Sequence, residues 1–125
     1  MYKLVIVFFQ PMAWATLNQG WQKFLALVEQ MPGLRKEAVA DVEEAIFGPP
    51  YYNFKKIHEL YFDSRESLED SLASEAGQAA GRWLHSFTQG KFVALIARHM
   101  EATPEQFKRQ VKGAPKASPP DIGSR

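Results

Sequence analysis

The chain of 125 residues has the length of one domain, and its 46% hydrophobic and 23% charged residues are typical of a globular protein. A net charge of +1 provides no field for attracting nucleic acid or acidic membranes, and the basic pairs Lys55-Lys56 and Lys108-Arg109 are isolated. Cysteine is absent, which excludes disulfides, thiol nucleophiles and thiolate metal sites and suits a reducing compartment. We expect a cytoplasmic protein with no nucleic-acid or membrane partner.

The first two predicted elements are a buried strand and an amphipathic helix. Leu4 to Phe9 is an unbroken apolar run ended by Gln10-Pro11, typical of a strand buried on both faces and much shorter than the roughly 20 residues that span a bilayer. Thr16 and Gln19 can form a capping box at the start of a helix. Pro32-Gly33 ends that helix, whose apolar stripe consists of Leu17, Trp21, Phe24, Leu25, Val28 and Met31.

The segment from Leu34 to Ala45 has two interpretations. Its Glu and Ala content favours a helix, whereas the alternation of residues between Ala38 and Glu43 indicates a strand, and both remain open. Gly48-Pro49-Pro50 predicts a loop. Aromatic and branched residues then predict a strand from Phe54 to Phe62.

Two helices and another strand follow in the prediction. Asp63 and Ser64 are candidate N-caps for a helix over residues 64–73, and Glu66 can complete a capping box with Asp63. A second helix is predicted from Glu75 to about His85. Phe92 to Ala97 is then predicted to be a strand that is apolar on both faces.

The end of the chain is predicted to be a short helix and a tail. Thr103-Pro104, followed by Gln106, opens the helix, since proline is well placed at the first helical position. The last residues are rich in Pro, Gly, Ser and Lys. We therefore predict one domain over residues 1–112 and a disordered tail over residues 113–125.

This element order predicts an α+β, ferredoxin-like βαββαβ fold with a four-stranded antiparallel sheet and its helices on one face. Alternate residues of the first strand, Leu4, Ile6 and Phe8, can face the helices, so the apolar residues between them face the other way. Each large apolar side chain on this second face would lose roughly 1.5–3 kcal/mol of burial free energy if it stayed in water. We therefore predict a homodimer in which a second copy covers this face, with an interface that includes Val5, Val7, Phe9 and Glu59.

Several motifs resemble the EthD family. Residues Glu59 to Ser64 read Glu-Leu-Tyr-Phe-Asp-Ser, and Ser74 to Ala80 read Ser-Glu-Ala-Gly-Gln-Ala-Ala, as in that family. The turn Met31 to Arg35 and the aromatic pair Tyr51-Tyr52 are similar too. The resemblance covers roughly Lys3 to Ala97 and implies a dimeric α+β barrel, in which two sheets close face to face.

One segment departs from the family pattern. EthD-like proteins usually carry Thr-His-x-Pro-Leu late in the first helix, whereas this chain has Lys-Phe-Leu-Ala-Leu over residues 23–27. The family's histidine falls on Phe24 and its proline on Ala26. The resemblance therefore implies that any chemistry performed by that histidine is missing here. The family's own reaction is unsettled, since its founding member accompanies an ether-degrading cytochrome P450 system in an undefined role.

His58 is the candidate acid–base residue. Strand alternation places it with Leu60 and Phe62, on the side that faces the helices. Polyketide cyclases of the same barrel superfamily, which are distantly similar, hold substrates in a cavity between sheet and helices. A histidine there can titrate near neutrality and transfer protons. The alternative is a buried histidine that is hydrogen-bonded to a neighbour.

The other ionisable residues favour structural roles. Glu59 faces away from the helices, so it would lie between the two sheets of the dimer as a hydrogen-bond acceptor. His85 is near a helix end and His99 follows the last strand, and we expect both at the surface. No spacing of histidines and carboxylates supports a metal site, and no glycine-rich loop supports a nucleotide, so we expect no metal and no cofactor.

The predicted ligand is a small apolar or aromatic catabolite, bound between sheet and helices and isomerised or cyclised there with the help of His58. Phe24 in place of a histidine makes such a pocket drier. Three alternatives remain: the aromatic residues are plain core packing, the protein is a non-catalytic accessory or binding subunit of a degradation pathway, or it is a ligand-free structural module. The predicted lining consists of Leu4, Ile6, Phe8, Phe24, His58, Leu60, Trp83 and Phe87.

Overall fold

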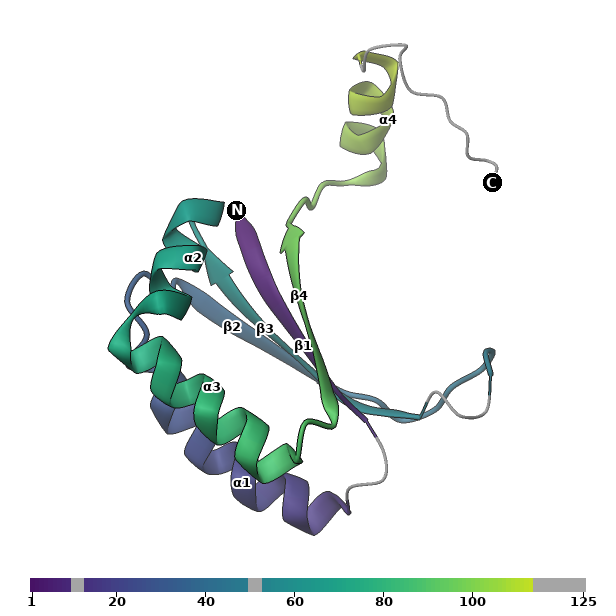
Figure 1. Cartoon of the computed structure of the whole chain (residues 1–125). Coiled ribbons are helices and arrows are strands. Elements are labelled where there is room, and N and C mark those ends of the chain that lie inside the picture. Colours follow the sequence, from purple (N-terminus) through teal and green to yellow (C-terminus); the bar gives the residue numbers. More distant parts are fainter. Residues whose placement is uncertain (10–12, 50–52, 114–125) are drawn as a thin grey trace.

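The computed structural model describes residues 1–9, 13–49 and 53–113. Its sheet has four strands in the order β2-β3-β1-β4, and every neighbouring pair is antiparallel. The predicted α+β, ferredoxin-like fold is confirmed (Figure 1). In chain order the elements are β1 (Tyr2–Phe9), α1 (Trp14–Val28), β2 (Lys36–Asp41), β3 (Phe54–Phe62), α2 (Arg65–Ala73), α3 (Glu75–Thr88), β4 (Phe92–Arg98) and α4 (Pro104–Gly113).

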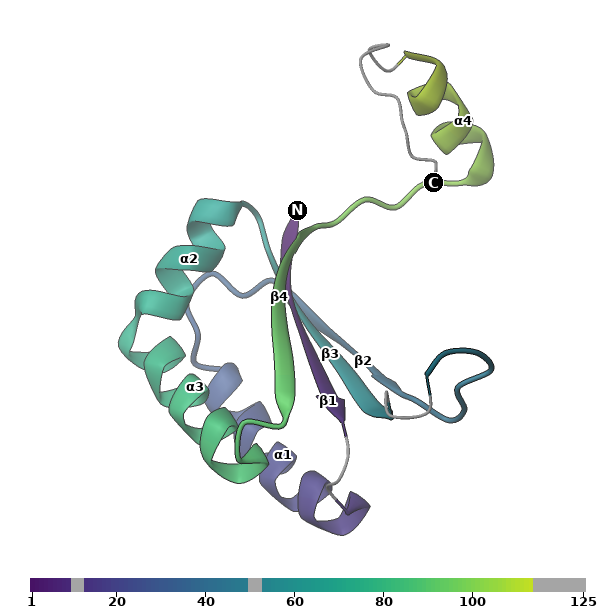
Figure 2. The same ribbon diagram turned by 45° about the vertical axis from the view of Figure 1, so that its right-hand side comes forward.

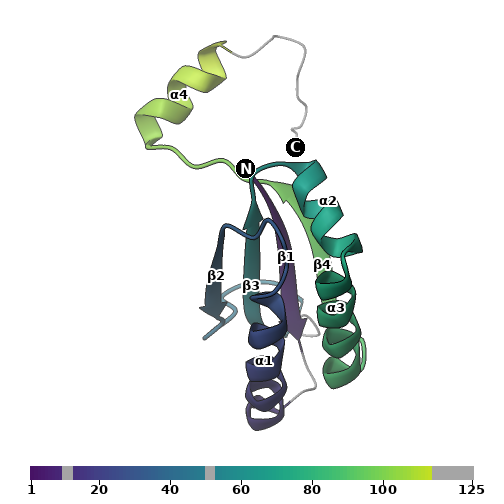
Figure 3. The ribbon, with the colours of Figure 1, turned by 90° about the vertical axis from the view of Figure 1, so that its left-hand side faces the viewer.

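The helices α1, α2 and α3 all lie on one side of the sheet, which we call the helix face (Figure 3). In the described chain no helix lies against the opposite side, the open face (Figure 2). Ile6 pairs with His58 on β3 and with Ala94 on β4, so these three side chains share the helix face. Successive side chains of a strand point to opposite faces of the sheet. The open face therefore carries Lys3, Val5, Val7, Ile57, Glu59, Tyr61, Val93, Leu95 and Ala97.

The hydrophobic core lies between the helix face and the three helices. Phe8 and Phe62 are completely buried on the strands. The helices contribute residues at helical spacing, which explains why each helix presents one apolar stripe to the sheet. These buried helix residues are Leu17, Phe24, Val28, Leu68, Ala80 and Leu84.

The helix starts differ from the predicted capping boxes at α1 and α2. The box of Thr16 and Gln19 is wrong, because α1 already begins at Trp14 and has no side-chain cap at Ala13. The backbone N–H of Leu17 donates to the Ala13 carbonyl oxygen at 2.9 Å, so Thr16 lies inside the first turn.

At α2 the predicted N-cap Ser64 is confirmed, whereas the predicted Asp63–Glu66 box is wrong. The Ser64 hydroxyl caps the helix by accepting a hydrogen bond from the Ser67 N–H at 3.0 Å. The Asp63 carboxylate instead accepts from Arg35 at 3.2 Å. A serine, Ser74, caps α3 in the same way, through the N–H of Gly77 at 3.0 Å.

The ambiguous segment forms a strand, β2, because its backbone pairs with β3 from Lys36 to Asp41. The helix α3 runs three residues beyond His85 and ends at Thr88, and its C-cap Gln89 has a left-handed φ of 55°. The predicted start of the last helix at Pro104 is confirmed. A capping box forms there: the Thr103 N–H donates to Gln106 Oε1 at 2.9 Å, and the Gln106 N–H donates back to Thr103 Oγ1 at 3.2 Å.

Some predictions fall outside the described residues. These are the strand end at Gln10-Pro11, the loop residue Pro50, the aromatic pair Tyr51-Tyr52 and the tail from residue 114 onward. Gly113, the first residue of the predicted tail, ends α4. Over the part of the chain that the structure describes, no helix has the length and apolar character needed to cross a membrane.

Candidate ligand pocket and buried histidine

An apolar pocket of about 200 Å³ lies between the helix face of the sheet and the helices. Strands β1, β3 and β4 form its floor, and α1, α2 and α3 supply its walls together with Met31 of the turn that follows α1. None of the described residues around it carries an ionisable side chain. The lining consists of Leu4, Ile6, Phe24, Met31, Leu60, Leu72, Gly77, Ala80, Gly81, Leu84, Phe92 and Ala94.

The mouth of this pocket lies between α3 and β4. Two of its lining residues, Gly81 on α3 and Ala94 on β4, are exposed. β4 is an edge strand, and Ile96, the next residue on its helix face, is 38% exposed. The helices therefore leave the outer part of the sheet open to solvent on this side.

Small residues on α3 create this opening, and they are the ones that identify the EthD-like motif. A Cβ at Gly77 would collide with the carbonyl oxygen of Ser71, so this glycine permits the close approach of α2 and α3. A Cβ at Gly81 would meet no heavy atom within 4 Å. Gly81 thus leaves free space in the wall, which a larger side chain would occupy.

Four of the residues predicted to line a pocket do so: Leu4, Ile6, Phe24 and Leu60. The aromatic residues Phe8, Trp83 and Phe87 instead pack beside it. Phe87 lies 6.3 Å from Phe8 and 5.6 Å from Trp83 between ring centroids. The residues of α3 and β4 were missed, although the spacing of Gly77, Ala80, Gly81 and Leu84 and the alternation of Phe92 with Ala94 could have identified them.

His58 is fully buried next to the pocket but is not part of its lining. Its ring lies 5.7 Å from Trp21 and 5.7 Å from Phe24, edge to face in both cases. Phe24 thus stands between His58 and the pocket, at the position where the resemblance implies a histidine in EthD-like proteins.

Both ring nitrogens of His58 have partners. Trp21 Nε1–H donates to Nδ1 at 3.2 Å, and since an indole is a donor only, Nδ1 carries no proton. Nε2 therefore carries the proton and donates it to Glu37 Oε1 at 2.7 Å. Glu37 reaches His58 from β2, because it lies on the same face of the sheet.

Burial lowers the pKa of His58 below its ordinary value of 6.5, against the opposing effect of the hydrogen bond to Glu37. The nearby Lys56 ammonium lowers it further. Lys56 is itself buried, pairs with Asp41 at 2.6 Å and lies 4.1 Å from the Trp21 ring centroid. His58 is thus a neutral histidine at pH 7, and its ring is fixed by two hydrogen bonds.

A second polar cluster lies on the open face. Glu59 accepts from the Tyr61 hydroxyl at 2.7 Å and from Lys3 Nζ at 3.1 Å. Burial alone would raise the pKa of Glu59, but these hydrogen bonds outweigh it and the pKa lies below the usual range. The hydrogen bond that Tyr61 donates to Glu59, together with burial, raises the pKa of Tyr61 to about 12. Glu59 is therefore an ionised acceptor.

The two remaining histidines differ. His85 is exposed on α3, as predicted. The prediction that His99 is solvated is wrong: its side chain is 17% exposed, its ring lies 4.8 Å from that of Tyr61, and Nε2 is 2.9 Å from Glu101 Oε1. Residues 1–9, 13–49 and 53–113 contain no cluster of three or more histidines and carboxylates able to hold a metal ion.

The predicted interface residues lie on the open face. Val5, Val7 and Glu59 are half-buried there. The residues beside them on β4 are more exposed, Val93 at 39% and Leu95 at 51%. Phe9 is also half-buried, with its ring 6.4 Å from that of Phe54.

No family model matches the chain. It is 27% identical over 97 residues to an uncharacterized 11.0 kDa protein encoded in the thcB-thcC intergenic region of Rhodococcus erythropolis. The match covers 77% of this chain and 92% of the relative. The relative's description assigns it no activity.

Solved structures share the fold. An EthD family protein from Bacillus halodurans superposes with a TM-score of 0.72 at 25% identity, over 80% of this chain and 99% of its own. A protein from Jannaschia described as dimeric, ferredoxin-like and of unknown function gives a TM-score of 0.55 at 12% identity, over 79% of this chain and 100% of its own. The predicted resemblance to EthD-like proteins of the ferredoxin-like α+β class is therefore confirmed.

Proposed function

We propose that this protein binds a small apolar or aromatic molecule in the pocket between its sheet and α3. The observation that carries the proposal is the pocket of about 200 Å³ whose described lining is entirely apolar. Such a space holds no ordered water well, because water needs polar partners. An apolar molecule that fills it gains contacts with the lining and displaces no strongly bound water.

The volume favours a ligand of about one aromatic ring. An apolar cavity of roughly 150 Å³ in another protein stays dry and accepts benzene. Drug-sized ligands fill pockets of about 300–1,000 Å³. The pocket, at about 200 Å³, is closer to the first case. Its mouth between α3 and β4 gives a path of entry that needs no unfolding.

Toluene is the probe that tests the proposal. We expect it to shift the methyl NMR signals of Leu4, Ile6 and Leu84, which line the pocket. The variant Gly81→Leu should abolish these shifts while remaining folded, because its side chain enters free space. The control Arg82→Leu adds the same side chain at the next, exposed position and should keep binding. Equal shifts in both variants would contradict the proposal.

A second candidate function, acid–base catalysis by His58 on the bound molecule, is favoured by the 2.7 Å contact of His58 with Glu37. A carboxylate that holds Nε2–H leaves Nδ1 as the base. Nδ1 would first have to release Trp21 and reach past Phe24. Nitrogen NMR of the His58 ring tests this: catalysis requires that a bound ligand breaks the Trp21 hydrogen bond, and an unchanged Nδ1 signal contradicts it.

We further propose that a second copy covers the open face. Val93 and Leu95 are exposed there beside half-buried valines of β1, and a continuous apolar patch of this kind marks an interface. The Jannaschia neighbour is described as dimeric. Sedimentation of the purified chain should give a dimer at micromolar concentration, and Leu95→Asp should give a folded monomer.

The cysteine-free chain suits the reducing cytoplasm, where we expect the protein to act.

A further inference from the structure

The terminal helix α4 stands clear of the domain that precedes it (Figures 1 and 3). The hydrogen bonds at the start of α4 join Thr103 to Gln106 and Phe107, so they are local to the helix. The helix has 10 residues, and isolated helices shorter than about 12–15 residues are marginal in water. Phe107 is 38% exposed on it. This helix therefore lacks the packing surface that would stabilise it.

The segment that leads to α4 is attached to the open face. The His99 backbone N–H donates to the Met1 carbonyl oxygen at 2.9 Å, and the His99 ring packs on Tyr61, an open-face residue. His99 Nε2 also contacts Glu101 at 2.9 Å. These contacts direct the chain away from the helices, and α4 lies on the uncovered side of the sheet (Figure 2).

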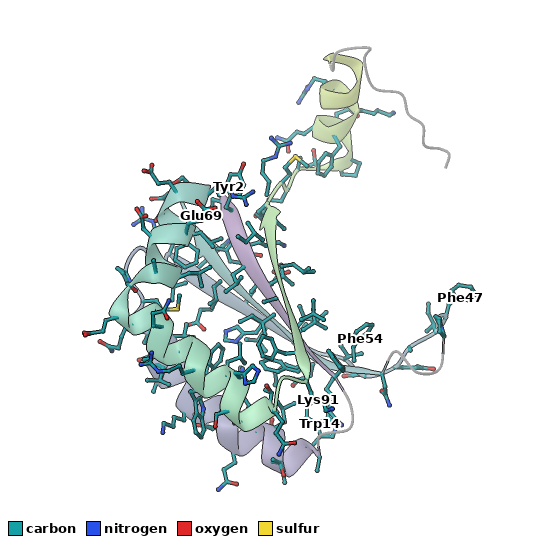
Figure 4. The ribbon with its side chains drawn as sticks, viewed as in Figure 1. Tyr2, Trp14, Phe47, Phe54, Glu69 and Lys91 are labelled. Carbon is teal, nitrogen blue, oxygen red and sulfur yellow. The ribbon has the colours of Figure 1, made fainter. Side chains whose placement is uncertain are left out.

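A second protrusion lies on the same side, at the opposite end of the sheet. Residues 42–49, which follow β2, extend away from the domain and carry Phe47 (Figure 4). Ile46 is 91% and Phe47 97% exposed, the highest values among the large hydrophobic residues described. The described part of this loop, residues 42–49, we call the acidic loop because it also contains Glu43 and Glu44.

The two protrusions are complementary in chemistry. α4 combines Phe107 with Lys108 and Arg109, whereas the acidic loop combines Ile46 and Phe47 with two glutamates. Within one chain they cannot meet, because they lie at opposite ends of the sheet (Figure 1). A two-fold rotation about an axis that runs across the strands exchanges the two ends of the sheet. In such a dimer each α4 lies over the acidic loop of the other copy.

We propose that α4 docks on the acidic loop of a second copy and so clasps the dimer at both ends of the open face. This inference rests on the self-association proposed above. Phe107 packs against Ile46 and Phe47, which removes three exposed apolar side chains from water, and Lys108 and Arg109 pair with Glu43 and Glu44. The docked surface supplies the packing that the short helix lacks.

Charge reversal measures the electrostatic part of the contact. Lys108→Glu with Arg109→Glu should weaken dimerisation at low salt by at least about fourfold, the lower end of the range for the four exposed ion pairs of the two clasps. Adding Glu43→Lys and Glu44→Lys to the same chain should restore the affinity. Reversal of the equally exposed Arg65 and Glu69 on α2 is the matched control and should leave it unchanged. If the variant with all four substitutions dimerises as weakly as the double variant, the proposed pairing is overturned.

Disulfide cross-linking of the full chain gives the decisive test, since the sequence has no cysteine of its own. Phe47→Cys chains mixed with Phe107→Cys chains should form a covalent heterodimer, whereas Gln22→Cys mixed with Phe107→Cys should not, because Gln22 lies on α1. Self-linking of Phe107→Cys alone, or a dimer in sedimentation without the heterodimer cross-link, overturns the docking and leaves self-association intact. A monomer in sedimentation overturns both.

Discussion

The two faces of the sheet are formed by the same strands, and yet they surround their side chains with different environments. His58 and Glu59 are consecutive residues of β3. His58 lies on the helix face, where burial keeps it neutral. Glu59 lies on the open face, where donors from Lys3 and Tyr61 keep it ionised. The difference shows that one step along a strand changes both the solvent and the charge state of a side chain.

The faces also differ in how completely they are covered. Ile6 on the helix face is 1% exposed, whereas Val93 and Leu95 on the open face of β4 are 39% and 51% exposed. One chain supplies enough helix surface for one face only. The pocket lies where that cover ends, at the edge strand β4.

The largest expected effect comes from truncating the same residue type on each face. Ile6→Ala should lower the free energy of unfolding by about 2–5 kcal/mol, because it leaves a cavity in the core. Ile57→Ala, on the half-buried open face, should lower it by much less in the monomer. Urea unfolding at a concentration that keeps the chain monomeric measures both. Equal losses would mean that a single copy packs both faces alike.

The next effect concerns the hydrogen bonds of the buried histidine. His58→Leu keeps the volume but leaves the Trp21 N–H and the Glu37 carboxylate without their partner. We expect a loss of about 1–3 kcal/mol, the usual penalty for an unsatisfied buried group. Urea denaturation of the variant beside the parent chain measures this loss. Unchanged stability would indicate that solvent already reaches these groups on the helix face.

A smaller effect is expected when the pH is lowered. The pKa of His58 in the folded protein lies below 6.5, the value of an unfolded histidine, so below that pH the unfolded chain binds more protons. The stabilising contribution is therefore complete above pH 6.5, falls as the pH drops below it, and is fully lost only below the lowered folded pKa. Urea denaturation between about pH 7.5 and about pH 5.5 measures the slope.

The control for this pH dependence is His58→Leu, which cannot titrate at that position. Its unfolding free energy should depend less on pH over the same interval. Glu59 contributes a slope of the same sign only at lower pH, since its pKa lies below 4.5. A steeper slope in His58→Leu than in the parent chain would contradict the neutral buried ring.

The smallest expected effect lies on the open face. Glu59→Gln keeps an acceptor for the Tyr61 hydroxyl and removes the charge paired with Lys3 at 3.1 Å. The pair is partly exposed, so we expect a loss of at most about 1 kcal/mol in the monomer. The pKa of Tyr61 should fall from about 12, which an absorbance titration of the phenol detects. A Tyr61 pKa that stays near 12 would exclude Glu59 as its cause.

Much of the fold follows from local patterns that a reader of the sequence can recognise. The stripe from Leu17 to Val28 forms a helix because its spacing matches one helical face, whereas Met31 lies in the turn after the helix. The alternation from Phe54 to Phe62 forms a strand and places His58 toward the helices. The capping boxes were less predictable, because several neighbouring polar residues can cap and the packing of the helix selects one, as Ser64 was selected over Asp63.

The sequence by itself determined the element order apart from β2, the face on which His58 lies and the excess of apolar residues on the strands. The tertiary structure decided that His58 is bound by Trp21 and Glu37, and that the pocket opens beside Gly81 and Ala94. The physical reason is that periodicity is a property of neighbouring residues along the chain. Hydrogen-bond partners and free volume arise between elements that are distant in the sequence, and they depend on how the sheet and helices pack.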